Sequence, residues 1–282
     1  MEEQRQSGKW EATEASNAAQ TLTALKTGVG EKADAGKLDV KGAIVQFMWW
    51  LKKQGYSDAT MKTKVNLLRQ LAKHCNIFEP EDVKRAIAAW ETWSQGHKRV
   101  AVHAYSNFAE MLGLKWEPPE YRHIGNLPFI PLERELDALI SGCSRKIAAC
   151  LQLLKETGMR IGEAWRLKWT DIDEEQNIIR CRAEKGGDPR AFKVSGKLIG
   201  MLKILPKKSI YVFGGTSLEA FHSMFRKQRK RLAHKLQNPR LEMITFHTFR
   251  HWKATMEYAK TKDILHVKQL LGHRNINSTL IY

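Results

Sequence analysis

Residues that can bind an anion and attack it occur in separate segments of the second half of the chain. Arginine stays cationic and presents fixed, paired donors, while a tyrosine hydroxyl, with a pKa of about 10, can act as a nucleophile beside cations or a base. Histidine and lysine can move protons. The candidates are Arg160 with Glu163, Lys185, His247 with Arg250, His273, and Tyr282.

Some of these residues also have an ordinary structural interpretation. Arg160 could form a salt bridge with Glu163 at the start of a helix. Lys185 lies in a segment dense in turn residues, where a solvated lysine is common. Tyr282 could be a surface or core tyrosine. Taken singly, none of them indicates a function.

The histidines are equally ambiguous when each is taken alone. His247 and His251 have the i, i+4 spacing of a zinc helix, but the metalloprotease pattern needs Glu after the first His, and Thr248 stands there. Gly272 is a natural helix C-cap, so His273 could merely satisfy the last carbonyls of a helix.

As a set, these residues resemble the catalytic residues of the tyrosine recombinase, or phage-type integrase, family. The segment 157–163 is similar to the family's first arginine box, 247–255 to its second, and 270–282 to its third. The resemblance covers the second half of the chain well and the first half in pattern only. Three residues depart from the family's usual choices without removing a catalytic group: Trp165, Phe249 and Trp252.

The resemblance implies that the chain cleaves and rejoins DNA through a 3′-phosphotyrosine intermediate formed on Tyr282. Attack on a phosphodiester adds charge to the non-bridging oxygens, which two guanidinium groups would stabilise. Arg160 and Arg250 would supply them, and Glu163 would orient Arg160. We expect site-specific recombination, with integration, excision and dimer resolution left open.

The remaining roles concern protons. In the family pattern His247 would accept the proton of the tyrosine, His273 would hydrogen-bond a non-bridging oxygen, and Lys185 would protonate the departing 5′-oxygen. This chemistry needs no cofactor, metal or ATP. In agreement, the sequence contains no GxxxxGK[ST] motif and no acidic cluster suited to two Mg²⁺ ions.

Composition favours a nucleic-acid partner. The net charge is +17, which a polyanion such as double-stranded DNA would offset. The alternatives are a solvated basic surface and a ribosome-associated protein. No apolar run is long enough to span a membrane, and the four scattered cysteines indicate a reducing, cytoplasmic location.

The elements that must position these residues are mainly helical. Apolar spacing predicts four short helices over 39–115, after a flexible tail at 1–38. The resemblance implies that these helices form the family's core-binding, DNA-binding domain. Prolines and Gly125 predict an extended linker over 116–130. Residues 131–282 would form the catalytic domain. The predicted fold is mainly α with a small antiparallel β-sheet.

Exposed bases in both domains would contact phosphates as the two domains clamp a duplex. In the first domain, solvated helix faces are an equally good interpretation. The candidates are Lys62, Lys64, Arg69, Lys98, Arg99, Arg226, Lys227 and Lys230.

Two other functions stay open beside a recombinase that assembles as a tetramer on paired sites. One is strand relaxation of the type IB topoisomerase kind, and the other is DNA binding with weak or lost catalysis. The chain stops at Tyr282, whereas relatives continue. A terminal carboxylate there would cost roughly 1–4 kcal/mol near a phosphate, so we expect a truncated form that cleaves weakly.

Overall fold

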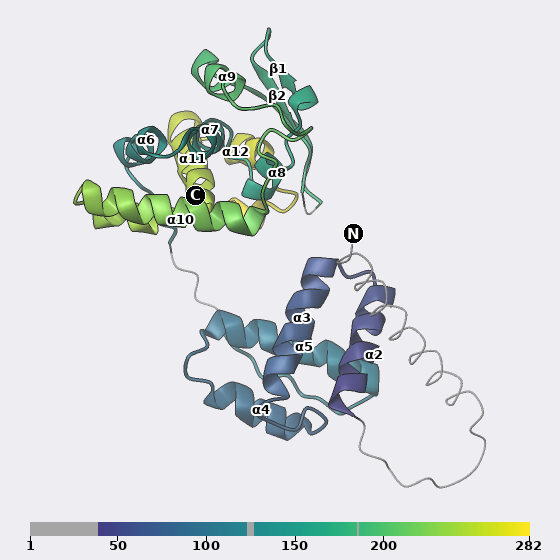
Figure 1. Cartoon of the computed structure of the whole chain (residues 1–282). Helices are drawn as coiled ribbons and strands as arrows, with labels where there is room; N and C mark the ends of the chain where they lie inside the picture. Colours follow the sequence, from purple (N-terminus) through teal and green to yellow (C-terminus); the bar gives the residue numbers. More distant parts are fainter. Residues whose placement is uncertain (1–38, 123–126, 185) are drawn as a thin grey trace, which may run out of the picture. The chain divides into compact units, whose positions relative to one another are not determined.

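A computed structural model describes residues 39–122, 127–184 and 186–282 (Figure 1). The chain divides into two compact units, Met1–Ile124 and Gly125–Tyr282. The predicted N-terminal tail at 1–38 and the candidate Lys185 lie outside the described residues.

The described part of the first unit is a small helical bundle. Its helices begin where local capping groups predict: the Ser57 hydroxyl accepts from the amide of Thr60, and the Ser94 hydroxyl accepts from that of His97. Phe47 and Phe108 pack edge to face in the core. The helices are α2 (Val40–Lys53), α3 (Asp58–Leu71), α4 (Pro80–Ala89) and α5 (Gln95–Leu112).

The segment predicted to be a linker packs at both of its ends. Trp116 and Tyr121 lie against the core of the first unit, and the indole of Trp116 donates to the Ser106 hydroxyl at 2.9 Å. Phe129 and Ile130 pack against the core of the second unit. Aromatic residues placed among prolines therefore attach each end of the segment to its own unit.

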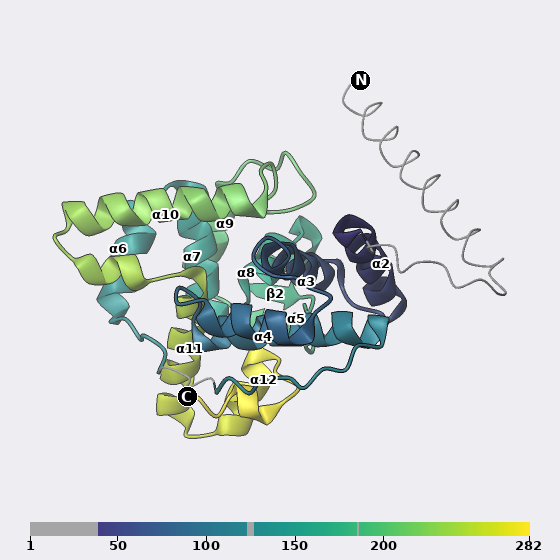
Figure 2. The same ribbon diagram turned by 90° about the horizontal axis from the view of Figure 1, so that it is seen from below.

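The second unit is built around α7 (Arg145–Thr157), in which nine of 13 residues are buried. Such a helix is apolar on most of its circumference, and it packs against α6, α9 and α11. The other α-helices are α6 (Glu133–Gly142), α8 (Ile161–Trp165), α9 (Gly196–Lys203), α10 (Leu218–Lys235), α11 (Phe246–Thr261) and α12 (Ile264–Leu271). In both views α10 lies beside α6 (Figures 1 and 2).

A three-stranded antiparallel sheet follows α8, in the order β1 (Ile172–Asp173), β2 (Ile178–Cys181) and β3 (Arg190–Lys193). Its register pairs Cys181 with Arg190 at the end of the hairpin where the loop between the two strands begins. Short 3₁₀ turns are η1 (Trp169–Asp171), η2 (Pro239–Met243) and η3 (Ile276–Ser278).

The predicted fold class is confirmed, because the described elements are mainly helical with one small antiparallel sheet. Within the described ranges, no helix combines the length and the apolar character that crossing a membrane requires.

Candidate active site

Arg160 is placed by a turn between two helices. Gly158, at φ 66°, ends α7 in the left-handed conformation, and Arg160 is the N-cap of α8. Glu163, three residues on, accepts from the Arg160 amide at 2.9 Å and from its guanidinium at 3.1 Å. The Glu163 side chain is fully buried while that of Arg160 is partly exposed. The Glu163 carboxylate therefore holds the Arg160 guanidinium from the buried side, and the rest of the guanidinium is accessible to solvent.

The same carboxylate has a second partner, which the sequence analysis missed. Arg190, at the start of β3, donates to Glu163 Oε2 at 2.7 Å and to the carbonyl of Leu271. Burial raises the pKa of Glu163, but its hydrogen bond from the Arg160 amide and the charge of Arg190 outweigh this and lower it overall. Arg190 follows a turn-rich segment, and nothing in the sequence around it indicates that it pairs with Glu163.

Arg250 joins all three chemical segments. It lies on α11 and is only 1% exposed. Its guanidinium donates to the carbonyl of Gly158 at 2.8 Å and to that of Leu271 at 2.6 Å. Burial, and then the charge of Arg160, lower its pKa to about 10, so it stays cationic at neutral pH.

His273 follows Gly272, the left-handed C-cap of α12 at φ 63°. Its Nδ1 lies 2.9 Å from the hydroxyl of the fully buried Thr279. Burial, and then the charge of Arg250, lower the pKa of His273 to about 4, so the ring is neutral at pH 7. If Nδ1 accepts from Thr279, Nε2 carries a proton that it can donate to an anion.

The hydroxyl of Tyr282 lies 2.8 Å from Nδ1 of His251. The expected proton acceptor, His247, lies one turn earlier on α11, is exposed, and contacts His251 edge to face at 4.5 Å between ring centroids. Burial raises the pKa of Tyr282, and the charges of Arg250 and Arg160 oppose that rise. The sequence feature that could have identified His251 as a site residue is its i, i+4 spacing from His247.

The described residues on either side of Lys185 lie close to this cluster. The Glu184 amide donates to Glu163 Oε1 at 3.4 Å. A Cβ added to Gly187 would lie 2.9 Å from the Gly272 carbonyl and 3.5 Å from the Arg160 guanidinium. The residues flanking Lys185 thus lie beside Arg160, although Lys185 itself is outside the described residues.

Comparison with known proteins decides the family. A model of the Phage integrase family matches residues 132–282, more than half of the chain. The chain belongs to the phage integrase family. The tyrosine recombinase XerA of Pyrococcus horikoshii is 30% identical to it over 249 residues, covering 85% of this chain and 87% of that protein. For other relatives, including TnP I resolvase of Bacillus thuringiensis at 26% identity, the match spans about half of the relative's length.

Solved structures of the family share the fold of this integrase-family chain. A lambda integrase (75–356) dimer bound to a core site gives a TM-score of 0.65 at 14% identity, covering 84% of this chain and 96% of that one. XerH site-specific recombinase bound to its difH substrate gives 0.61 at 19% identity, covering 89% and 94%.

The basic residues proposed to contact phosphates fall into two groups: some are exposed to solvent, and others are already hydrogen-bonded within the protein. Lys98 is only 8% exposed and donates to the Ala88 carbonyl at 2.7 Å, so it is not placed to meet a phosphate. Lys64 donates to Asn107 at 2.6 Å and ties α3 to α5. The exposed candidates are Lys62, Arg69, Arg99, Arg226, Lys227 and Lys230.

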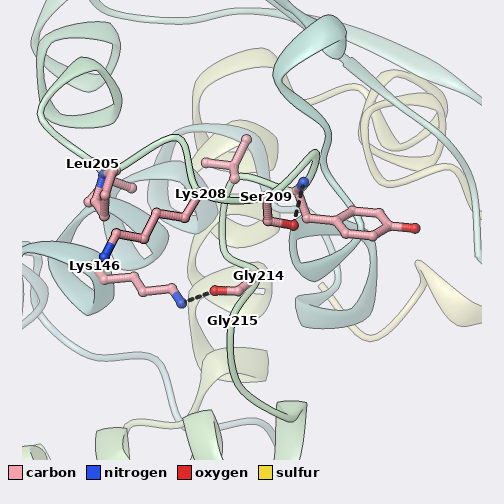
Figure 3. A pocket seen from close by; sticks show the side chains of 9 residues that line it. Lys146, Leu205, Lys208, Ser209, Gly214 and Gly215 are labelled. Atoms are coloured by element: carbon pink, nitrogen blue, oxygen red, sulfur yellow. Dashed lines mark hydrogen bonds between the residues drawn. The ribbon is translucent and has the colours of Figure 1, made fainter.

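A pocket of about 130 Å³ lies elsewhere in the second unit (Figure 3). The Lys146 ammonium crosses it to donate to the Gly214 carbonyl at 2.5 Å, which fixes the loop that follows α9. None of the candidate active-site residues lines it. Among the described residues, no three His, Cys, Asp or Glu side chains gather closely enough to hold a metal ion.

Proposed function

We propose that this protein is a site-specific DNA recombinase, or integrase, that cleaves and rejoins DNA through a 3′-phosphotyrosine link to Tyr282. One observation carries the proposal. The guanidinium of Arg250 bridges the carbonyls of Gly158 and Leu271, each two residues before a proposed catalytic residue, Arg160 and His273. This contact joins the three separated segments into one site.

The site can stabilise the charge that develops during attack on a phosphodiester. Arg160 and Arg250 supply two cations, and His273 supplies a neutral donor, for the non-bridging oxygens. Glu163 holds Arg160 from behind, so little reorganisation is needed when the anion arrives. Losing one such donor typically lowers a rate by about 10²–10³-fold.

Cleavage balances as a transfer between two oxygens. The Tyr282 hydroxyl gives its proton to a histidine of α11 while its oxygen forms a bond to phosphorus, and the bond from phosphorus to the 5′-oxygen breaks. The departing oxygen takes a proton, which we assign to Lys185 on the hairpin. The phosphotyrosine bond retains the energy of the diester, so rejoining is nearly isoenergetic and the proposed reaction needs neither metal nor ATP.

The partner we propose is double-stranded DNA, bound by self-association into a tetramer on paired sites. The net charge of +17 and the exposed bases support a polyanionic partner. Among structures of similar fold are a lambda integrase tetramer bound to a Holliday junction and XerH bound to difH. We assign DNA binding to 39–115 and catalysis to 131–282. The four free cysteines favour a cytoplasmic location.

Trapping of a covalent adduct tests the proposal. A nicked duplex from which the cleaved strand end diffuses away should accumulate protein attached to a 3′-phosphate, in excess EDTA and without ATP. Mapping the trapped ends on a pool of DNA should show preferred positions. Trapping without preference, together with plasmid relaxation, would indicate a topoisomerase instead. DNA binding without any adduct would indicate that catalysis is lost.

A further inference from the structure

We propose that His251, rather than His247, accepts the proton of Tyr282 as its oxygen attacks phosphorus. This inference rests on the proposed function and assigns one step within it. Nδ1 of His251 lies 2.8 Å from the tyrosine hydroxyl, within reach of direct proton transfer. The hydroxyl has no other hydrogen-bond partner among the described residues.

The backbone fixes this pairing. His251 directly follows Arg250 on α11, so the helix that positions the buried arginine also positions the imidazole. His247 lies one turn earlier and touches the ring of His251, at 4.5 Å between centroids. His247 is more exposed to solvent than His251, which suits contact with the substrate phosphate better than contact with the tyrosine.

The protonation state of His251 suits an acceptor. Burial, then the neighbouring His247 and the charge of Arg250, lower its pKa to about 4. The ring is therefore neutral at pH 7, with a lone pair on one nitrogen. If Nδ1 carries the lone pair, Nε2 carries the proton.

A bound phosphate would offset the smallest of the three contributions that lower the pKa of His251, the charge of Arg250. The cation that lowers the pKa of His251, Arg250, is one of the two proposed to hold the phosphate. A bound phosphate brings negative charge that offsets the arginine, and so raises the proton affinity of the ring. The tyrosine oxygen also becomes far more acidic as its bond to phosphorus forms, so transfer is favourable within the transition state.

The step balances in both directions. During cleavage the Oη–H bond breaks and an Nδ1–H bond forms while Oη bonds to phosphorus. The 5′-oxygen leaves with a proton from the separate acid. During rejoining the 5′-hydroxyl returns its proton to that acid as it attacks phosphorus. The bond from phosphorus to the tyrosine oxygen breaks, and the His251 imidazolium returns its proton to that oxygen.

Two variants of His251 separate proton acceptance from positioning. His251→Asn can place an amide group near the position of Nδ1, so it can keep a hydrogen bond to Tyr282 without taking up a proton. His251→Ala keeps neither. We expect both variants to form the adduct about 10²–10⁴-fold more slowly, the usual contribution of a general base, with unchanged DNA affinity. If His251→Asn reacts at the wild-type rate, His251 only positions the tyrosine and the proposal fails.

A more acidic nucleophile tests the proton directly. Fluorinated tyrosine introduced at position 282 depends less on a base, so it should recover much of the rate lost in His251→Asn. His247→Asn serves as the matched variant, and its rate should not be recovered in this way. The substrate carries sulfur at the 5′-bridging position, so that leaving-group protonation does not limit the rate. Recovery in His247→Asn but not in His251→Asn would overturn the proposal. Absence of any adduct in the wild-type protein would instead refute the proposed function.

Discussion

The Arg190 guanidinium and the Glu163 carboxylate form a buried ion pair, 2.7 Å apart, with side chains 6% and 0% exposed. Arg190 also donates to the Leu271 carbonyl, which receives a second bond from Arg250. The hairpin, the turn at Arg160 and the end of α12 therefore meet at one pair of side chains.

Removing Arg190 should cost both stability and activity. Arg190→Ala leaves a buried carboxylate with fewer partners, and breaking a buried pair typically costs about 3–5 kcal/mol. Glu163 would then hold Arg160 less firmly, so adduct formation should slow even where the protein stays folded. Urea unfolding and single-turnover trapping measure the two effects.

The matched control is an ion pair on the surface. Arg85→Ala removes the partner of Asp82, and the Arg85 side chain is 79% exposed. Its cost should be about 0–1 kcal/mol. Equal losses in the two variants would mean that the buried pair has no special role.

A methyl group at Gly272 should disturb the active site. Gly272 has φ 63°, and an added Cβ would lie 3.0 Å from the Arg190 guanidinium. Gly113 has φ 65° with nothing within 4 Å, so Gly113→Ala measures the backbone cost alone, about 1–2 kcal/mol. We expect Gly272→Ala to lose more stability than Gly113→Ala and also to lose cleavage. Identical effects on stability and normal cleavage would contradict the proposed crowding.

Stability should fall in mild acid because of two histidines. In the folded chain the pKa values of His251 and His273 are lowered to about 4 from an ordinary 6.5. The unfolded chain therefore binds more protons between these pH values. The stability that the two histidines contribute is fully present above about pH 6.5 and declines as the pH falls toward 4. His251→Asn should lose less stability than the wild-type protein between pH 7 and 4.5 in urea unfolding. If His251→Asn and the wild-type protein lose the same amount of stability over this pH range, the pKa of His251 is not lowered in the folded chain.

Lys185 should matter only when the leaving group needs a proton. Lys185→Ala should cleave ordinary DNA slowly, by about 10²–10⁴-fold, but cleave a substrate with sulfur at the 5′-bridging position nearly normally. Single-turnover rates on the two substrates give the comparison. Equal loss on both would assign Lys185 another role.

Local signals in the sequence were sufficient for most helices. Apolar spacing predicts four short helices over 39–115, and the structure contains them, with Ser57 as the cap of α3 and Pro80 in the first turn of α4. These features act within a few residues of chain, so no tertiary information is needed.

Contacts between residues far apart in the sequence could not be predicted from such local features. Arg190 meets Glu163 only because the hairpin register places Arg190 opposite Cys181. His251 meets Tyr282 across 31 residues. Lys98 is buried and donates to the Ala88 carbonyl, although it was predicted to be an exposed base. Residue type identified the chemistry of the site, while these pairings depend on the tertiary fold.

The nucleophile is the central claim, and Tyr282→Phe tests it most directly. The change removes one oxygen, so fold and DNA affinity should stay nearly intact. Tyr258→Phe, which removes the same atom from another tyrosine of the same apolar cluster, is the control. On a nicked duplex, Tyr282→Phe should form no covalent DNA adduct, while Tyr258→Phe should form it as the wild-type protein does. An adduct that persists in Tyr282→Phe would contradict the account.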